Sequence, residues 1–453
     1  MKRPIIMRVD SDEYPACPFQ VNGVKARLEN PDSADSDNLL FAFRLNGEPD
    51  RDALDCAIRA VMTRHEPLRT VFRSAAEFPL AHVLPVDQAW PGLHVVDLSP
   101  GGIGLRELAG QIRDTSFDIE RGPVLRVTLA RQGEANYVLL VCVEHGVCDG
   151  LNSLAVFSRD LGTAYGAMAA GTAPDFPAAP LRYRDFAVTL RQWLGEGAQD
   201  EILAFWKARL PVDEPIPSLP LITRSPQSAF ATGVVATQHY EVPGREIAGL
   251  NSVLRSHKVS RYILMVATLF AALRIMNRAE RVGMLTSLAY PWPGIANTLG
   301  HYANLSILAC ELSLTQSLSD VLNIARDTVL CAVQHCDMPF GVLMSTLCPE
   351  APPALPVFLS VRTPDQYQSW HSATVQARPC PIPRMDSHTS HPGLKVVATL
   401  SNQVFRFAVD YPVRAFRDEE IASFIGQCAA VLTQLATDPG RRLGDVGGWH
   451  TQR

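Results

Sequence analysis

A histidine and an aspartate four residues apart occupy the segment 144–150, whose sequence is EHGVCDG. His145 could act as a general base, because the unperturbed pKa of imidazole lies near neutral pH. Asp149 could accept a hydrogen bond or an ion pair and so fix the turn that aims the histidine. The HxxxDG pattern is short, and a lone histidine after a strand is more often structural than catalytic. The segment is therefore a candidate site only if the rest of the chain supports it.

The stretches on both sides of this segment can hold it rigidly. Residues 137–144 (YVLLVCVE) are nearly all apolar, which is typical of a strand buried on both faces. Residues 151–165 have the periodicity of a helix. The histidine therefore lies at a strand end, where the neighbouring glycines let a substrate approach the backbone.

The remaining pattern predicts a mixed α/β chain. Pro49 and Asp50 open a helix whose apolar residues Leu54, Ile58 and Val61 recur at helical spacing. Further strands are predicted at 39–45, 68–73, 124–129, 234–242, 282–289, 304–312 and 404–411. Further helices are predicted at 186–193, 202–210, 247–255, 261–276, 318–335 and 419–435.

The chain is too long for one hydrophobic core. Its 453 residues indicate two lobes, and 47% hydrophobic with 19% charged residues lets each lobe bury a core. Two proline-rich stretches, 170–180 and 211–226, are typical of connections between domains. We expect an N-terminal lobe at 1–180, connecting helices and a linker at 181–226, and a C-terminal lobe at 227–453.

Composition and charge exclude several classes of protein. A net charge of −5 and a pI near 6.2 argue against nucleic-acid binding. The N-terminal apolar stretch is too short for a signal peptide, and 262–273 is too short for a membrane span, so we expect a core helix there. The ten cysteines form no CxxC pair and no cluster with zinc-ligand spacing. We therefore expect a cytoplasmic protein without a bound metal, and we expect a monomer.

Five segments resemble, in order, the motifs of nonribosomal-peptide condensation domains. Residues 64–72 (RHEPLRTVF) resemble RHExLRTxF, and 144–150 resembles HHxxxDG. Residues 183–187 (YRDFA), 299–304 (LGHYAN) and 337–340 (DMPF) are similar to YxDFA, GxFxN and DxPF. Order and spacing match throughout, so the resemblance covers nearly the whole chain.

This resemblance implies a chloramphenicol-acetyltransferase-like architecture, in which two α/β lobes form a V-shaped pseudo-dimer. The active site would lie in a tunnel between the lobes. The donor thioester would enter on one side and the acceptor on the other.

The resemblance also assigns roles to individual residues. His145 matches the second histidine of the family motif, which is the general base. Asp149 matches an aspartate that pairs with an arginine of the RHExLRT segment; Arg69 is the preferred partner and Arg64 the alternative. Gly150 would allow close approach of the substrate, and its N–H group could face the developing oxyanion.

Two further positions complete the predicted site. Asn304 would either line the substrate or form a strand-edge hydrogen bond, and both alternatives stay open. Glu144 replaces the first histidine of the family motif. Because neighbouring side chains of a strand point to opposite faces, Glu144 and His145 need not share a role. We expect Glu144 to support the site structurally.

The function implied is that of a free-standing acyltransferase in polyketide or nonribosomal-peptide biosynthesis. The acyl donor would be a phosphopantetheine thioester on a separate acyl or peptidyl carrier protein, or a coenzyme A thioester. The acceptor would be a small-molecule amine or alcohol, giving an amide or an ester. A thioester is already activated, so positioning, a base and oxyanion donors suffice, and we expect no bound cofactor. Two alternatives stay open: a coenzyme A-dependent alcohol acyltransferase, and a non-catalytic recruitment module on the same fold.

Overall fold

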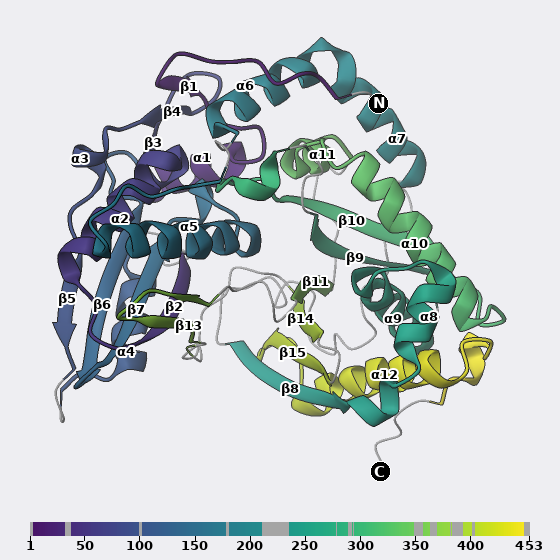
Figure 1. Cartoon of the computed structure of the whole chain (residues 1–453). Helices are drawn as coiled ribbons and strands as arrows, with labels where there is room; N and C mark the ends of the chain where they lie inside the picture. Colours follow the sequence, from purple (N-terminus) through teal and green to yellow (C-terminus); the bar gives the residue numbers. More distant parts are fainter. Residues whose placement is uncertain are drawn as a thin grey trace. The chain divides into compact units, whose positions relative to one another are not determined.

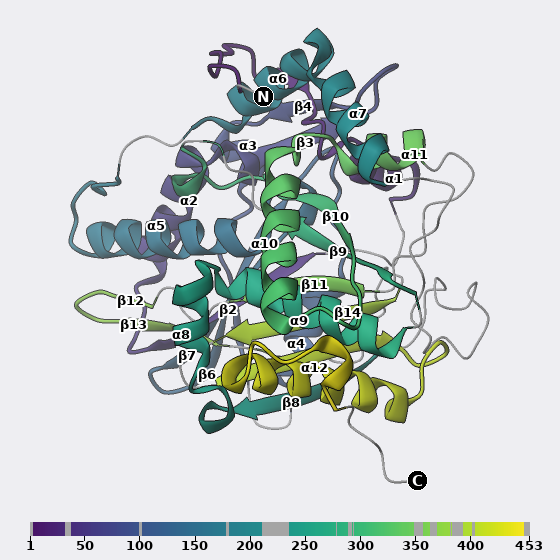
Figure 2. The ribbon, with the colours of Figure 1, turned by 90° about the vertical axis from the view of Figure 1, so that its right-hand side faces the viewer.

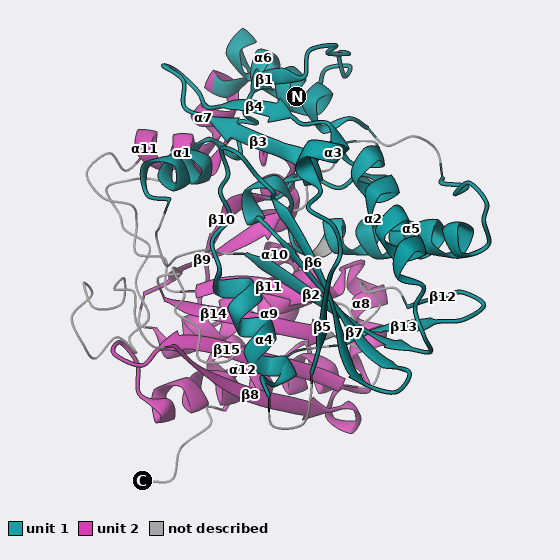
Figure 3. Ribbon diagram, turned by 90° about the vertical axis from the view of Figure 1, so that its left-hand side faces the viewer, with its two compact units in different colours: residues 1–199, 290–303, 365–385 teal, residues 200–289, 304–364, 386–453 magenta. Residues whose placement is uncertain are grey.

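The chain forms two compact units, and each unit is made of three separate stretches of the sequence (Figure 3). Unit 1 comprises Met1–Gln199, Tyr290–Ala303 and Asp365–Met385, and unit 2 comprises Asp200–Ala289, Asn304–Pro364 and Asp386–Arg453. The computed structural model describes residues 3–31, 38–98, 102–177, 181–210, 235–277, 279–288, 292, 294–347, 357–362, 369–380, 382, 393–400 and 404–447.

Unit 1 is built on a six-stranded sheet with the order β12-β13-β2-β7-β6-β5 and a three-stranded sheet with the order β1-β4-β3. Among the described strands of the larger sheet, the β5–β6 pair is parallel and the other pairs are antiparallel. The strands of unit 1 are β1 (Glu13–Pro15), β2 (Leu39–Asn46), β3 (Thr70–Arg73), β4 (Leu80–Val83), β5 (His94–Asp97), β6 (Leu125–Gly133), β7 (Asn136–Val143), β12 (Trp370–His371) and β13 (Gln376–Pro379). Figure 1 shows the late strand β13 beside the early strand β2.

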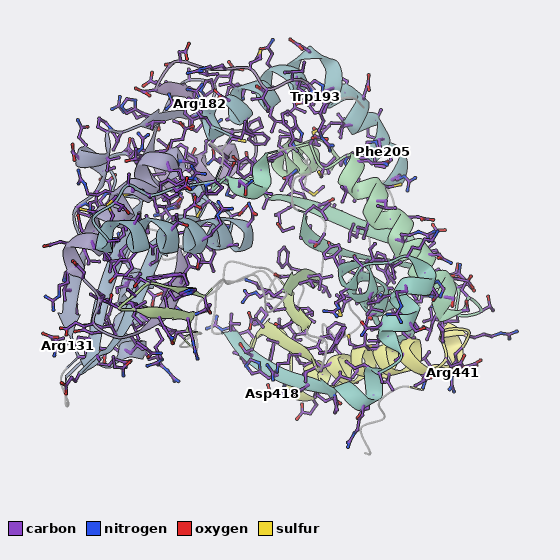
Figure 4. All side chains as sticks on the ribbon, in the orientation of Figure 1. Arg131, Arg182, Trp193, Phe205, Asp418 and Arg441 are labelled. Carbon is purple, nitrogen blue, oxygen red and sulfur yellow. The ribbon has the colours of Figure 1, made fainter. Side chains whose placement is uncertain are left out.

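Both faces of the larger sheet in unit 1 are apolar at its centre. Seven of the eight residues of β7 are buried, which confirms the prediction of a strand covered on both faces. Val138 and Leu140 pack in one cluster with Leu108 and Ala109 of α4. The helices of unit 1 are α1 (Val21–Glu29), α2 (Arg51–Arg64), α3 (Val86–Ala89), α4 (Leu105–Asp114), α5 (Leu151–Ala169) and α6 (Tyr183–Trp193). The α6 helix begins after Arg182, and Figure 4 labels both Arg182 and Trp193.

Unit 2 contains the second six-stranded sheet, with the order β10-β9-β11-β14-β15-β8. The β9–β11 and β11–β14 pairs are parallel and the other pairs are antiparallel. Its strands are β8 (Val235–Pro243), β9 (Arg281–Leu288), β10 (Asn304–Glu311), β11 (Val357–Arg362), β14 (Leu394–Leu400) and β15 (Val404–Pro412). Its helices are α7 (Gln199–Arg209), α8 (Leu250–His257), α9 (Arg261–Met276), α10 (Leu318–Gln334), α11 (Phe340–Leu347) and α12 (Asp418–Thr437). Helix α9 packs against both α10 and α12 (Figure 2).

Local sequence signals explain where two long helices begin. Asp50 caps α2, because its carboxylate accepts a hydrogen bond from Ala53 N at 2.9 Å. Ser260 caps α9 in the same way, through Ile263 N at 3.2 Å. The helix predicted at 261–276 has the same bounds as α9, and its many buried residues confirm the prediction of a core helix.

The predicted mixed α/β class is confirmed, but the structure divides the chain differently from the predicted ranges 1–180, 181–226 and 227–453. Helix α6 belongs to unit 1 although it lies in the predicted connection, and two later segments return to unit 1. The reason is sheet pairing and side-chain contact over long sequence separations, which composition does not reveal. The proline-rich stretch 211–226 lies outside the described residues.

Helix length and hydropathy bear on membrane spanning. Among the described residues, no single helix is long and apolar enough to cross a bilayer. The pair Gly244–His257 and Arg261–Met276 meets the criteria of length and composition only when its two bent halves are combined.

Candidate active site

The candidate base lies directly after the most buried strand of unit 1. The backbone N–H of Glu144 donates to Val124 O at 3.0 Å, so strand pairing continues to the residue before His145. A 3-10 turn, His145–Val147, follows, and α5 begins at Leu151. The His145 side chain is partly exposed. A side chain at the end of a paired strand is held precisely enough to serve as a base.

A second histidine lies next to His145, and the predicted site did not include it. His301 Nδ1 is 3.0 Å from the backbone oxygen of His145, and the ring centroids are 5.5 Å apart in a T-shaped arrangement. Burial lowers the pKa of His301 to about 4, with a further contribution from the charge of His145. His301 is therefore neutral near pH 7, and two imidazoles lie side by side in unit 1.

Asp149 joins the start of α5 to the segment that carries His301. Its Oδ1 accepts hydrogen bonds from Ser153 Oγ at 2.9 Å and Ser153 N at 3.1 Å. Its Oδ2 accepts a longer bond from Tyr302 N at 3.4 Å, and its backbone N–H donates to Gly300 O at 2.9 Å. Burial raises the pKa of this carboxyl, and the Ser153 hydrogen bonds partly offset that shift.

The predicted ion pair between Asp149 and an arginine of the RHExLRT segment is wrong. Arg69 donates to the carbonyl oxygens of Met62 at 3.0 Å and Leu84 at 2.6 Å. Arg64 lies 2.9 Å from Asp160 of α5. Among the described residues the partners of Asp149 are hydroxyl and backbone N–H groups. Such donors can satisfy a buried carboxyl without a countercharge.

The first three residues of this motif, Arg64, His65 and Glu66, instead connect α2 to α5 and α6 within unit 1. His65 Nε2 lies 2.7 Å from Asp160 Oδ2, and both side chains are fully buried. Burial alone would raise the pKa of Asp160, but hydrogen bonds from His65 and Arg159 outweigh it and lower the pKa to about 2. These motif residues are therefore structural supports of the unit that carries the base.

The next motif residue pairs with the YRDFA helix. Glu66 Oε2 accepts a hydrogen bond from Arg184 Nε at 2.8 Å, and Glu66 Oε1 accepts one from Arg184 N at 2.7 Å. Both side chains are 8% exposed. Two motifs that the sequence shows as separate are thus joined by a buried ion pair.

Three residues near His145, namely Glu144, Gly146 and Gly150, differ in how closely other atoms approach them. Glu144 is 7% exposed. A Cβ at Gly146 would lie 2.6 Å from Glu144 Oε2, so a glycine there leaves room for this carboxylate. A Cβ at Gly150 would meet only Leu39 Cδ2, at 3.9 Å. Space inside unit 1 therefore does not require a glycine at 150, and its role toward the substrate stays a prediction.

Asn304 has a structural place in unit 2. Its Nδ2 donates to the carbonyl oxygens of Cys336 at 2.9 Å and Met338 at 2.5 Å, and its Oδ1 accepts from Phe340 N at 3.2 Å. The residue is 6% exposed. Asn304 thus connects the start of β10 to the DMPF segment, which corresponds to the hydrogen-bonding alternative and not to the substrate-lining one.

Further chemistry in the described residues could come from metal-ligating side chains or from the two cysteines near the candidate base. They contain no group of three or more His, Cys, Asp or Glu side chains that could hold a metal ion. Burial raises the pKa of Cys142 to about 12 and also raises that of Cys148. These two thiols near the candidate base are therefore protonated and unreactive.

The chain matches a known protein family over nearly its whole length. The condensation-domain family model matches residues 11–449. Chondramide synthase cmdD of Chondromyces crocatus is 26% identical over 424 residues, which is 90% of this chain and 10% of that protein. The chain thus spans only a small part of such relatives.

Solved structures show the same fold. The X-domain from teicoplanin biosynthesis, solved in complex with OxyB, superposes with a TM-score of 0.81 and 25% identity, covering 99% of this chain and 98% of that one. The first condensation domain of the calcium-dependent antibiotic synthetase gives a TM-score of 0.79 at 16% identity, covering 97% and 100%. The chloramphenicol-acetyltransferase-like fold class is confirmed, and the chain belongs to the condensation-domain family, as its five motifs predicted.

Proposed function

We propose that this chain transfers an acyl group from a thioester to an amine or alcohol, with His145 as the general base. The observation that carries the proposal is the placement of His145: it follows a strand buried on both faces, and its side chain is partly exposed. The neutral imidazole of His301 lies against it.

The reaction needs one proton acceptor and one activated carbonyl. His145 takes the proton from the acceptor N–H or O–H as the nitrogen or oxygen attacks the thioester carbon. The tetrahedral intermediate then releases the thiolate, which takes up the proton from His145. The N–H group of Gly150 is our candidate donor to the oxyanion. Asp149 has a positioning role, because it fixes the turn and the facing segment.

The donor and acceptor are proposed at the level of chemical class. The donor is a phosphopantetheine thioester on an acyl or peptidyl carrier protein in trans, with coenzyme A as the alternative. The product is an amide or an ester in natural-product biosynthesis, as for the family. The free-standing state and the tunnel between two lobes stay predictions.

Acyl-loaded carrier protein and acyl-coenzyme A, each offered with a panel of amines and alcohols, test the proposal by mass spectrometry. His145→Ala should lower turnover about 10²- to 10⁴-fold, the usual contribution of a general base. Glu144→Gln is the matched control on the neighbouring residue and should keep most activity. Unchanged turnover in the His145→Ala protein would rule out the base role.

A second candidate function is a non-catalytic module that recruits a partner enzyme. Two observations favour it: Glu144 stands where the family motif has its first histidine, and the X-domain at 25% identity was solved in complex with OxyB. Absence of acyl transfer with every donor, together with direct binding of a tailoring enzyme from the same pathway, would support this function over the first.

A further inference from the structure

The segment that resembles GxFxN carries a histidine at its variable position. His301 lies 156 residues after His145 in the sequence, yet its Nδ1 is 3.0 Å from the backbone oxygen of His145. The two rings form an edge contact, with centroids 5.5 Å apart and planes at 75°. Neither the HxxxDG motif nor the role of His145 as the base accounts for this second imidazole.

The hydrogen bond of His301 fixes which of its nitrogens carries the proton. A backbone carbonyl only accepts, so Nδ1 must be the N–H donor. In the neutral ring Nε2 is then the acceptor, with a free lone pair. Within the described residues no hydrogen bond reaches Nε2, and the side chain is partly exposed. Nε2 can therefore accept a hydrogen bond from an incoming molecule.

The backbone around His301 is held on both sides within unit 1. Tyr183 Oη donates to His301 O at 2.9 Å. Gly300 O accepts from Asp149 N at 2.9 Å, and Tyr302 N donates to Asp149 Oδ2. A ring whose backbone is fixed by three separate contacts keeps its acceptor in one place, which a positioning group requires.

We propose that His301 is a substrate-positioning residue whose Nε2 accepts a hydrogen bond from the acceptor beside His145, and that the pair selects a primary amine over an alcohol. This rests on the proposed acyl transfer. A primary amine has two N–H groups, one for each imidazole, whereas an alcohol has a single O–H. With an alcohol bound, Nε2 of His301 would lack a hydrogen-bond donor. An unsatisfied acceptor in the site lowers the affinity for the alcohol.

The chemistry balances with distinct roles for the two rings. The amine nitrogen forms a bond to the acyl carbon, and the carbon–sulfur bond breaks. His145 takes one proton from the nitrogen and returns it to the leaving thiolate. The second N–H stays in the product amide and remains hydrogen-bonded to His301. The low pKa of His301, about 4, suits a group that accepts a hydrogen bond without removing the proton.

Two substitutions test the roles of the two ring nitrogens of His301 separately. In His301→Asn the side-chain NH₂ can take the place of Nδ1 and keep the bond to His145 O, but nothing replaces Nε2. In His301→Gln the side-chain oxygen can reach the place of Nε2 and accept from the substrate. Thermal unfolding of both variants controls for folding, and the substrates are an amino-acid amide and the matching 2-hydroxy-acid amide.

We expect the wild type to prefer the amine. His301→Asn should lower the amine-over-alcohol ratio of kcat/KM by about tenfold to a hundredfold, and His301→Gln should restore a large part of it. ¹⁵N-histidine NMR should show an unprotonated Nε2 on His301 whose resonance shifts when the amine is added without a thioester.

Three results would overturn the inference: a wild type that prefers the alcohol, a ratio unchanged in His301→Asn, or an Nε2 resonance that ignores the amine. If His145→Ala abolishes transfer while His301→Asn behaves as wild type, the inference fails and the proposed function stands. A wild type that transfers no acyl group to any acceptor defeats both.

Discussion

Replacing Asp149 by alanine and by asparagine tests which groups stabilise the candidate site. The carboxylate accepts two hydrogen bonds from Ser153 and a longer one from Tyr302 N. Asp149→Ala removes all three and leaves the backbone N–H groups of Ser153 and Tyr302 without these acceptors. Loss of a side-chain acceptor for an N–H group in the first turn of a helix costs about 1 kcal/mol, and a buried unsatisfied donor costs about 1–3 kcal/mol. We expect a loss of about 2–4 kcal/mol in the free energy of unfolding.

Asp149→Asn should cost much less. The amide oxygen can still accept both bonds from Ser153, and only the 3.4 Å bond from Tyr302 is lost. We expect a loss of about 1 kcal/mol at pH 7. An ion pair with Arg69 or Arg64 would have predicted about 3–5 kcal/mol for either substitution, because both would leave a buried arginine without its countercharge.

The pH dependence of stability gives an independent check on the same residue. Burial raises the pKa of Asp149 in the folded protein above its ordinary value of 3.8. The folded state then binds the proton more tightly than the unfolded state, so this contribution to stability is fully present below pH 3.8 and is lost as the pH rises through the raised pKa. Asp149→Asn has no such loss, so its stability relative to wild type should improve as the pH rises.

Urea unfolding followed by circular dichroism measures these differences in the free energy of unfolding. They follow from the shift in the midpoint urea concentration when the slope of the free energy against urea concentration is unchanged. Ser153→Ala is the matched partner, and a double-mutant cycle with Asp149→Ala should give a coupling energy of about 1–3 kcal/mol. Asparagine and alanine variants of equal stability, or strict additivity with Ser153→Ala, would show that the hydrogen-bond network is not what Asp149 contributes.

Two further substitutions test the supports of the site. Gly300→Ala should lower stability by about 1–3 kcal/mol, because its Cβ would lie 2.5 Å from the Tyr183 ring. Gly150→Ala is the control and should leave stability nearly unchanged. Equal melting temperatures for the two variants would contradict this prediction. Glu66→Gln should lower stability by about 1–3 kcal/mol, because Arg184 loses the charge of Glu66 and keeps its ion pair with Asp12. Thermal unfolding within 1 °C of wild type would show that the Glu66–Arg184 pair contributes little.

Local pattern predicted most of the elements that position the site. The apolar run at 137–144 corresponds to β7, and the helical periodicity after Gly150 corresponds to α5. Both follow from the nearest neighbours in the chain: a strand covered on both faces needs apolar residues throughout, and a helix needs one apolar side. The short strands β12 and β13 were not predicted, because β13 is stabilised by pairing with β2, more than 300 residues earlier in the chain, and β12 by pairing with β13.

The sequence by itself determined the family, the α/β class and the candidate base His145, since each depends on residue type and spacing along the chain. The tertiary structure decided what surrounds that base. It placed His301 beside His145, gave Asp149 hydroxyl and amide donors in place of an arginine, and assigned Asn304 to the DMPF segment. The physical reason is that hydrogen bonds form between groups within about 3 Å in space, and sequence spacing does not specify which distant segments fold to within that distance.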